Sequence, residues 1–189
     1  MRILQVNDVS LSFGGLNVID RLSFDVEEGS IVSLIGPNGA GKTSVFNCLT
    51  GFYKANSGDI RFQEKSVLQF KPHKITQSGM ARTFQNLRLF KNMTVLENVM
   101  SGMHCRTKAG AVGAIFHTPA QHAEEAEIRR TAEECLDFVG ILGHKDRLAK
   151  NLPYGDQRRL EIARALASRP KVLLLDEPAA GMNPSESQE

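Results

Sequence analysis

The chain has 189 residues, of which 41% are hydrophobic and 23% charged, and its formal net charge is +2. This composition is ordinary for a soluble globular protein, and the length suffices for one domain with a sizeable buried core. The small charge argues against a nucleic-acid or lipid surface, and no apolar run approaches the roughly eighteen residues of a membrane span. The N-terminus turns polar too early for a secretory signal. The three cysteines are widely spaced and suggest neither a disulfide framework nor a zinc site. We therefore expect a chain that resides in the reducing cytosol.

In chain order, the first half alternates between strand and helix patterns. Apolar residues at every second position, or in short runs, predict strands at residues 3–13, 21–27, 30–35, 58–62 and 81–84. The third of these is mostly apolar and ends at Gly36, which favours a buried parallel strand. Helices are expected at residues 41–49, where Gly51 supplies the stop, and at residues 72–78.

The second half is mainly helical in pattern. Helices are expected at residues 94–102, 119–142 and 155–168, with a Gly/Ala-rich loop at residues 107–118. In the longest helix one apolar face comprises Ile128, Ala132, Cys135, Leu136, Val139 and Leu142. An apolar strand at residues 171–175 follows. The order of elements predicts an α/β nucleotide-binding core with a helical insertion.

The turn between the 30–35 strand and the first helix matches a phosphate-binding loop. Its eight positions are Gly36, Pro37, Asn38, Gly39, Ala40, Gly41, Lys42 and Thr43. Glycines allow the backbone to approach a triphosphate, and the inward N–H groups with the helix dipole attract its charge. Lys42 is predicted to contact the β- and γ-phosphates, Thr43 to bind magnesium and Ser44 to lie near the α-phosphate. The alternative is a glycine-rich turn that happens to precede a helix.

Two adjacent carboxylates close the 171–175 strand. Asp176 is predicted to hold magnesium through its hydration shell, beside the phosphate loop, and Glu177 to orient or deprotonate the attacking water. Two carboxylates after a buried strand are costly unless a cation is near, which favours a site. The alternative is a strand that simply leaves for solvent at Asp-Glu-Pro.

With these motifs in place, the chain resembles the ABC ATPase family over essentially its whole length. The resemblance rests on the order of the phosphate loop, Gln85, the segment 152–157 (Leu-Pro-Tyr-Gly-Asp-Gln) and the acidic strand end. It is strongest to the ATP-binding subunits of branched-chain amino-acid importers, through residues 35–43, 46–52, 82–90 and 154–164. The implied fold is a P-loop NTPase (RecA-like) core with an N-terminal antiparallel β subdomain, a helical insertion and its last strands missing. The implied division is a core of residues 1–85 and 169–189 and a helical subdomain of residues 86–168.

The resemblance also implies roles for single residues. Gln85 looks like the glutamine that senses magnesium and water and links to the membrane subunit; taken alone it reads as a surface amide. Phe13 resembles the aromatic residue that stacks on adenine, but it shares parity with Val9 and Leu11 and is equally consistent with plain core.

Gly155 resembles the signature glycine that caps the γ-phosphate on a second subunit in a head-to-tail dimer. Its alternative is an ordinary capped helix. Pro153 stands where the family has a serine and Tyr154 where it has a glycine, so one expected phosphate contact is missing. Residues 179–183 resemble the loop that passes the two active sites, or form a simple turn. Residues 86–103 lie where the family docks a membrane-subunit helix.

The functional expectation is an ATP-binding and ATP-hydrolysing subunit of an importer, using ATP and Mg²⁺. Its expected partners are a second ATP-binding subunit, transmembrane permease subunits and, indirectly, a solute-binding protein, with no nucleic acid. Its expected location is cytoplasmic, peripheral on the inner face of the cell membrane.

The end of the chain departs from the family pattern. The family has a γ-phosphate histidine on a later strand, and none of the five histidines here follows Glu177. We therefore expect a C-terminally incomplete domain, whose own hydrolysis is in doubt. The alternatives are a nucleotide-binding fragment without catalysis and a non-transport ABC ATPase of translation or DNA repair.

Overall fold

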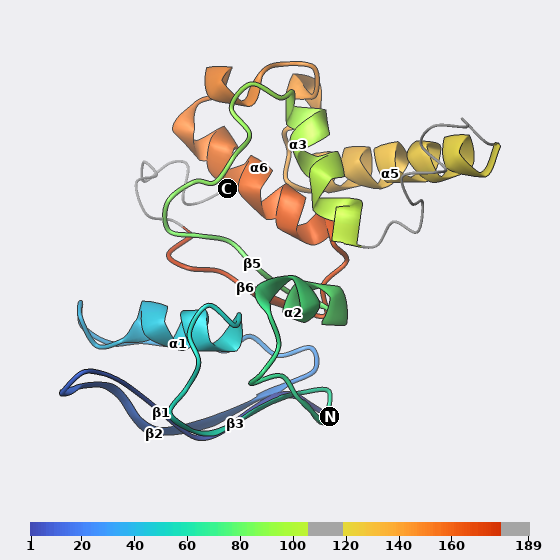
Figure 1. Ribbon diagram of the computed structural model, residues 1–189. Coiled ribbons are helices and arrows are strands. Elements are labelled where there is room, and N and C mark those ends of the chain that lie inside the picture. The colour runs from blue at the N-terminus through green and yellow to red at the C-terminus, as the bar shows by residue number, and fades with distance from the viewer. Residues whose placement is uncertain (106–118, 179–189) are drawn as a thin grey trace. The chain divides into compact units, whose positions relative to one another are not determined.

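The computed structural model describes residues 1–105 and 119–178. The chain divides into two compact units, residues 1–78 and 79–189, and each is described by itself (Figure 1). This division differs from the predicted one of a split core around residues 86–168, which remains a prediction. Among the described residues, no helix is both long and apolar enough to cross a membrane.

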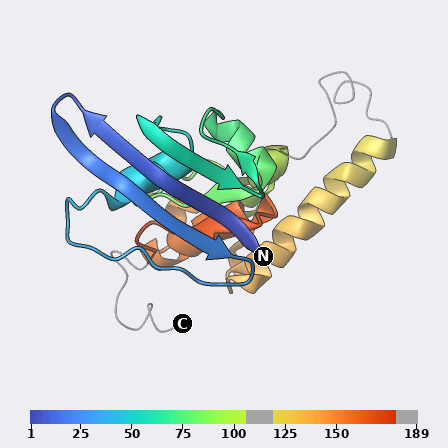
Figure 2. The same ribbon diagram turned by 90° about the horizontal axis from the view of Figure 1, so that it is seen from below.

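The first unit is built on an antiparallel sheet with strand order β2-β1-β3-β4 (Figure 2). Its strands are β1 (Arg2–Phe13), β2 (Leu16–Glu27), β3 (Ser57–Phe62) and β4 (Lys65–Ser66). The strands expected at residues 3–13, 21–27 and 58–62 are confirmed, and the second begins earlier than expected. The break at Gly14-Gly15 is the turn of the β1–β2 hairpin.

A bulge in β1 explains why its buried residues change parity. Leu4 and Val6 are buried in the first half, and Val9 and Leu11 in the second. Between Val6 and Val9 the pairing register shifts, and Asp8 has a φ of +48°. The extra residue turns the second half of the strand over, so both halves bury their apolar side chains. Gly58 on β3 is needed here, because a Cβ would lie 2.5 Å from the carbonyl oxygens of Asn7 and Asp8.

Two short helices complete the first unit as predicted. Helix α1 (Lys42–Leu49) ends before Gly51, whose φ of +74° stops it, and lies along one face of the sheet (Figure 1). Helix α2 covers Pro72–Ser78.

The predicted buried strand at residues 30–35 is wrong. Within the described part of the chain this segment belongs to no strand, and Ile31 is 97% and Ile35 90% exposed. An apolar run forms a central strand only where other strands pair with it, because its backbone N–H and C=O groups need partners. The paired strands of the described residues are instead β1–β4 with one another and β5 with β6.

The second unit contains a two-stranded parallel sheet of β5 (Met80–Arg82) and β6 (Val172–Leu174), in which Arg82 pairs with Leu174. Both strands are shorter than expected, and β6 is half-buried rather than buried. The remaining elements are helical: α3 (Val95–Ser101), η1 (Gly102–Cys105), α5 (Pro119–Phe138), η2 (Leu142–His144), η3 (Ala149–Asn151) and α6 (Tyr154–Ala167). The expected helix at residues 119–142 therefore stops early, at Phe138, before Gly140 with its φ of +76°.

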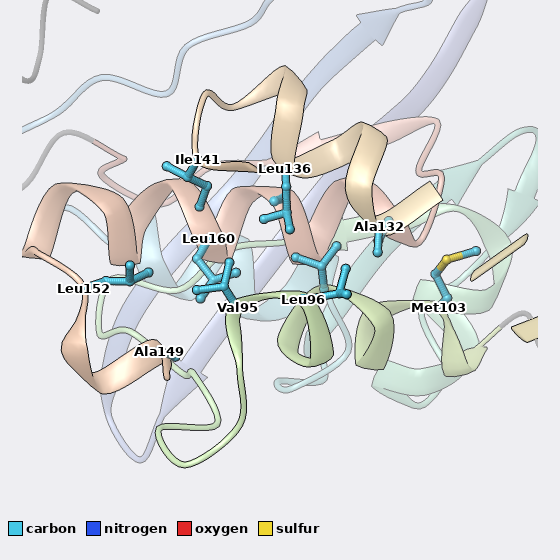
Figure 3. Packing of buried hydrophobic residues seen from close by; sticks show 12 residues of the cluster. Val95, Leu96, Met103, Ala132, Leu136, Ile141, Ala149, Leu152 and Leu160 are labelled. Carbon is cyan, nitrogen blue, oxygen red and sulfur yellow. The ribbon is translucent and has the colours of Figure 1, made fainter. Parts of the chain in front are cut away.

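The core of the second unit lies between α3, α5 and α6. Figure 3 shows side chains of the three helices pointing toward one another, among them Val95, Leu136 and Leu160, which are fully buried. All six residues of the predicted apolar face belong to this cluster or pack against it, but only four of them are on α5, because Val139 and Leu142 lie beyond its end. The predicted loop at residues 107–118 lies outside the described residues.

Candidate functional site

The glycine-rich loop of residues 36–43 folds around the amino group of Lys42. The Lys42 Nζ donates hydrogen bonds to the carbonyl oxygens of Gly36, at 2.6 Å, and Pro37, at 2.9 Å. Helix α1 begins at Lys42, and its first turn contains no acidic residue. The loop therefore ends in a helix N-terminus whose positive partial charge is left uncancelled, an arrangement that attracts a phosphate group.

The loop requires its last glycine on steric grounds. Gly41 is the N-cap of α1 and has a φ of +84°. A Cβ at this position would lie 2.6 Å from the carbonyl oxygen of Val18 on β2, closer than side-chain carbons approach backbone. Only glycine therefore allows the loop to turn against the sheet before the helix starts.

The remaining predicted phosphate-loop residues lie on the same turn. Asn38, Gly39 and Ala40 form the exposed part of the loop, and Gly39 has a φ of +85°. Thr43 and Ser44 occupy the first turn of α1, where Thr43 is exposed and Ser44 half-buried. The hydroxyl groups thus stand beside the helix N-terminus that the loop creates.

Phe13 is not part of the core. It lies at the end of β1 and is 49% exposed, whereas Val9 and Leu11 on the same strand are buried. Its ring meets that of Tyr53 edge to face, with centroids 5.2 Å apart. The open ring is compatible with stacking on a base, which remains a prediction.

In the second unit, Asp176 is buried against an arginine. Arg82 Nη2 lies 2.8 Å from Asp176 Oδ2, and the two side chains are only 5% and 6% exposed. The Asp176 backbone N–H also donates to Thr83 Oγ1, at 3.4 Å. The cation that a buried carboxylate needs is thus supplied by β5 of the same chain.

The structure brings together two of the predicted catalytic residues, Gln85 and Glu177. Gln85 Nε2 donates a hydrogen bond of 3.0 Å to Glu177 Oε2, and both groups are exposed. Glu177 has a φ of +49°, a backbone conformation that non-glycine residues rarely adopt. Such outliers occur often at functional sites, because the surrounding structure must hold them in place.

Gly155 lies in the first turn of α6 and is buried. Pro153 is the N-cap, and no side chain caps the helix there. The same turn contains Asp156, which lies 4.0 Å from Arg159 Nη1. A carboxylate at this end already uses the positive end of the helix dipole, so phosphate capping by Gly155 remains a prediction.

Three charged residues at these positions escaped the prediction from sequence. Arg82 pairs with Asp176, while Arg158 and Glu161 on α6 form a buried ion pair of 3.2 Å. The signal for the α6 pair was its i,i+3 spacing, which makes the two side chains neighbours on the helix surface. Arg82 gave no comparable signal, because its partner is 94 residues away in sequence. The predicted interface loop at residues 179–183 lies outside the described residues.

Comparison with known proteins identifies the family. A family model described as ABC transporter matches residues 19–180. The chain is 48% identical over 187 residues to the high-affinity branched-chain amino acid transport ATP-binding protein LivG of Salmonella typhimurium, covering 99% of this chain and 73% of that protein. It is 46% identical, with the same coverage, to the corresponding protein BraF of Pseudomonas aeruginosa.

The fold has a solved counterpart. The ADP conformation of an ATP-binding cassette of an ABC transporter matches with a TM-score of 0.84 and 34% identity, over 100% of this chain and 73% of that one. Both the sequence motifs and the elements that carry them therefore agree with one family. The chain belongs to the ABC transporter ATPases, with the P-loop NTPase fold of an ATP-binding cassette.

Proposed function

We propose that this chain is the ATP-binding and ATP-hydrolysing subunit that powers an importer of branched-chain amino acids. One observation carries the substrate class: the 48% identity over 187 residues to a protein named for branched-chain amino acid transport. The proposal that the chain binds ATP is supported separately, by the glycine-rich loop that surrounds the Lys42 amino group at the N-terminus of α1.

The proposed nucleotide contacts follow from the first unit. The loop N–H groups and Lys42 bind the phosphates, because both present positive charge to the same anion. Ser44 lies near the α-phosphate, and Phe13 offers its exposed ring to the adenine. These contacts require the loop conformation that the positive φ angles of Gly39 and Gly41 make possible.

The proposed magnesium ligands fit the ion by their chemistry. Thr43 offers a hydroxyl and Gln85 an amide oxygen, and magnesium prefers such hard oxygen donors. Asp176 already pairs with Arg82 through Oδ2, so its proposed contact with the ion is through the hydration shell. Because Nε2 of Gln85 donates to Glu177, its amide oxygen remains the acceptor of that side chain. Magnesium bound with ATP would neutralise phosphate charge during phosphoryl transfer.

Glu177 is proposed to orient the attacking water and accept its proton. Its carboxylate is exposed and already held by the Gln85 amide, so a shift of Gln85 changes the orientation of the proposed base. This contact gives Gln85 a way to act on hydrolysis, in addition to any contact with magnesium.

The proposed partners are a second ATP-binding subunit, with Gly155 facing its nucleotide, transmembrane permease subunits and, indirectly, a solute-binding protein. The proposed location is the cytoplasmic face of the membrane, because the similar proteins are ATP-binding proteins of transport and transport needs a membrane-embedded partner.

Reconstitution tests the proposal. The chain is combined in liposomes with the permease subunits and solute-binding protein of a branched-chain amino-acid importer, and ATP-dependent leucine uptake is measured. We expect uptake with the wild-type chain and at least a tenfold loss with Lys42→Ala, because one phosphate-binding charge disappears. Lys74→Ala, on the exposed surface of α2, is the matched control.

The outcomes separate the alternatives. ATP binding without turnover in the assembled complex would favour a nucleotide-binding fragment without catalysis. Turnover that never yields uptake, with any permease pair that binds the chain, would contradict the transport role.

A further inference from the structure

Helix α6 holds the backbone around Gln85 through arginine side chains. Arg158 donates from Nη1 to the carbonyl oxygen of Phe84, at 2.6 Å, and from Nη2 to that of Gln85, at 2.5 Å. Six residues further along the helix, Arg164 donates to the carbonyl oxygen of Arg88. Two arginines of one helix thus hold the segment 84–88 by its carbonyl groups.

The Arg158 guanidinium is buried and paired. It is paired with Glu161 at 3.2 Å, and the two side chains are 3% and 2% exposed. Glu161 Oε1 in turn accepts from the backbone N–H of Arg88, at 3.4 Å. A buried ion pair adds little stability over apolar residues of similar volume, so stability alone does not account for it. The planar guanidinium of Arg158 donates to two successive carbonyl groups at once, which a lysine side chain cannot do.

Arg158 also contacts the first turn of its own helix. Its guanidinium lies 5.9 Å from the centroid of the Tyr154 ring, in a cation–π arrangement. The same guanidinium therefore lies against Tyr154 of the segment 152–157 and donates to the backbone carbonyl of Gln85. The Gln85 side chain continues the connection by its hydrogen bond to Glu177.

We propose that Arg158 is a positioning residue that sets the orientation of Gln85 and couples it to the first turn of α6. Displacement of Tyr154 or Gly155 by a bound partner moves Arg158, and Arg158 carries the Gln85 backbone with it. This inference rests on the proposed function for the role of Gln85, whereas the mechanical link to residues 84–88 stands on the contacts alone.

Hydrogen–deuterium exchange on the full chain tests the mechanical link. Arg158→Lys retains the charge opposite Glu161 but cannot span both carbonyls. We expect exchange in a peptide covering residues 84–89 to rise about tenfold, while a peptide covering residues 128–136 of α5 is unchanged. Arg159→Lys, the neighbouring arginine that lies near Asp156, is the matched control and should leave both peptides unchanged.

Two results would overturn the link. Unchanged exchange in residues 84–89 would show that Arg158 does not hold them. A rise spread evenly over the second unit, with a lowered unfolding temperature, would show a general role in stability. If Arg158→Lys does not fold, the double variant Arg158→Gln/Glu161→Gln provides the same test, because it loses the guanidinium without leaving a buried charge unpaired.

A double-mutant cycle tests the action through Gln85. ATP affinity is measured with magnesium chloride and with EDTA for the wild type, Arg158→Lys, Gln85→Ala and the double variant. We expect the magnesium-dependent gain in affinity to shrink equally in all three variants, because residues that act through one another are not additive. Two results would contradict a positioning role for Arg158. In one, the two single variants lose magnesium-dependent affinity independently, so that the losses add in the double variant. In the other, Arg158→Lys keeps the full magnesium-dependent gain in ATP affinity while Gln85→Ala loses it.

The two measurements fail separately. If Gln85→Ala keeps the full magnesium gain, the proposed role of Gln85 is wrong, and the exchange of residues 84–89 still decides whether Arg158 holds them.

Discussion

The buried ion pair of Arg82 and Asp176 changes the interpretation of the acidic residues that follow β6. Two carboxylates at the end of β6 suggested that a cation must be near, and magnesium was the expected one. The structure supplies a guanidinium 2.8 Å from Asp176 instead. Arg82 thereby fixes the Asp176 carboxylate within the second unit. The exposed neighbour Glu177 is left to interact with Gln85.

Phe13 can be tested separately from the phosphate loop. Phe13→Ala should weaken ATP binding about five- to tenfold, because the lost ring removes stacking on the adenine, worth roughly 1–1.5 kcal/mol. It should leave the binding of inorganic tripolyphosphate unchanged, since that ligand has no base. Both affinities are measured by isothermal titration calorimetry on the purified chain.

Tyr53 provides a check on the same experiment. Because its ring packs against Phe13 edge to face, Phe13→Tyr should keep both this contact and ATP affinity. Equal weakening of ATP and tripolyphosphate by Phe13→Ala would show that the substitution disturbs the loop rather than a stacking contact.

At the scale of elements, the capping of a helix end determines where α3 of the second unit begins. Thr94 forms a capping box with Glu97: its hydroxyl accepts the Glu97 backbone N–H at 3.1 Å, and its own backbone N–H donates to the Glu97 carboxylate at 2.7 Å. This fixes the start of α3, whose first residues, Val95 and Leu96, enter the core. The helix was predicted to start at residue 94, and Thr94 is its N-cap.

The capping box makes stability depend on pH. Hydrogen bonds from the Thr94 backbone N–H and hydroxyl lower the pKa of Glu97 below its ordinary value of 4.5. Because the folded pKa is depressed, this stabilisation is fully present above pH 4.5 and disappears as pH falls through the lower folded value. Glu97→Gln should therefore flatten the loss of stability below pH 4.5, measured by urea unfolding at several pH values.

Two companion substitutions complete the test of the cap. Thr94→Ala should cost about 1 kcal/mol at neutral pH, because an orphan N–H loses its acceptor. Thr94→Ser keeps the hydroxyl and should leave both stability and pH profile near those of the wild type. Parallel pH profiles for the wild type and Glu97→Gln would contradict a role of the box.

At the scale of the whole molecule, the apolar segment of residues 30–35 is the main surprise. Ile31 and Ile35 are almost fully exposed, although the sequence has the composition of a core strand. Contiguous exposed apolar residues promote association between chains. The segment directly precedes Gly36, so its conformation affects the position of the phosphate loop.

Substitution of Ile31 and Ile35 tests whether these side chains are exposed or buried in the folded protein. The double variant Ile31→Ser/Ile35→Ser should change the free energy of unfolding by less than about 0.5 kcal/mol, as expected of surface positions, and should reduce light scattering. Ile60→Ser on β3, at a fully buried position, is the control and should lose several kcal/mol, roughly 2–5. A loss of similar size in the double variant would show that the segment is buried.

Much of this molecule was predictable from local pattern. The phosphate loop, the hairpin of β1 and β2 and the helices α1, α2 and α3 follow from short-range features: glycine positions, strand alternation and caps. The apolar face of α5 was predictable for the same reason, because its period of 3.6 residues places Ala132 and Leu136 together. The family, and with it the ATP chemistry, followed from the order of motifs along the chain.

Long-range contacts decided the rest. Arg82 pairs with Asp176 and Arg158 holds the backbone of Gln85, and both contacts join residues more than 70 positions apart in sequence. Whether residues 30–35 form a strand likewise depends on a pairing partner elsewhere in the chain, and the described residues provide none. Local sequence fixes the conformation of a loop or a helix end, because the groups involved are neighbours along the chain. Which buried charge finds which partner is settled only when packing excludes water and leaves each charge the partners within reach.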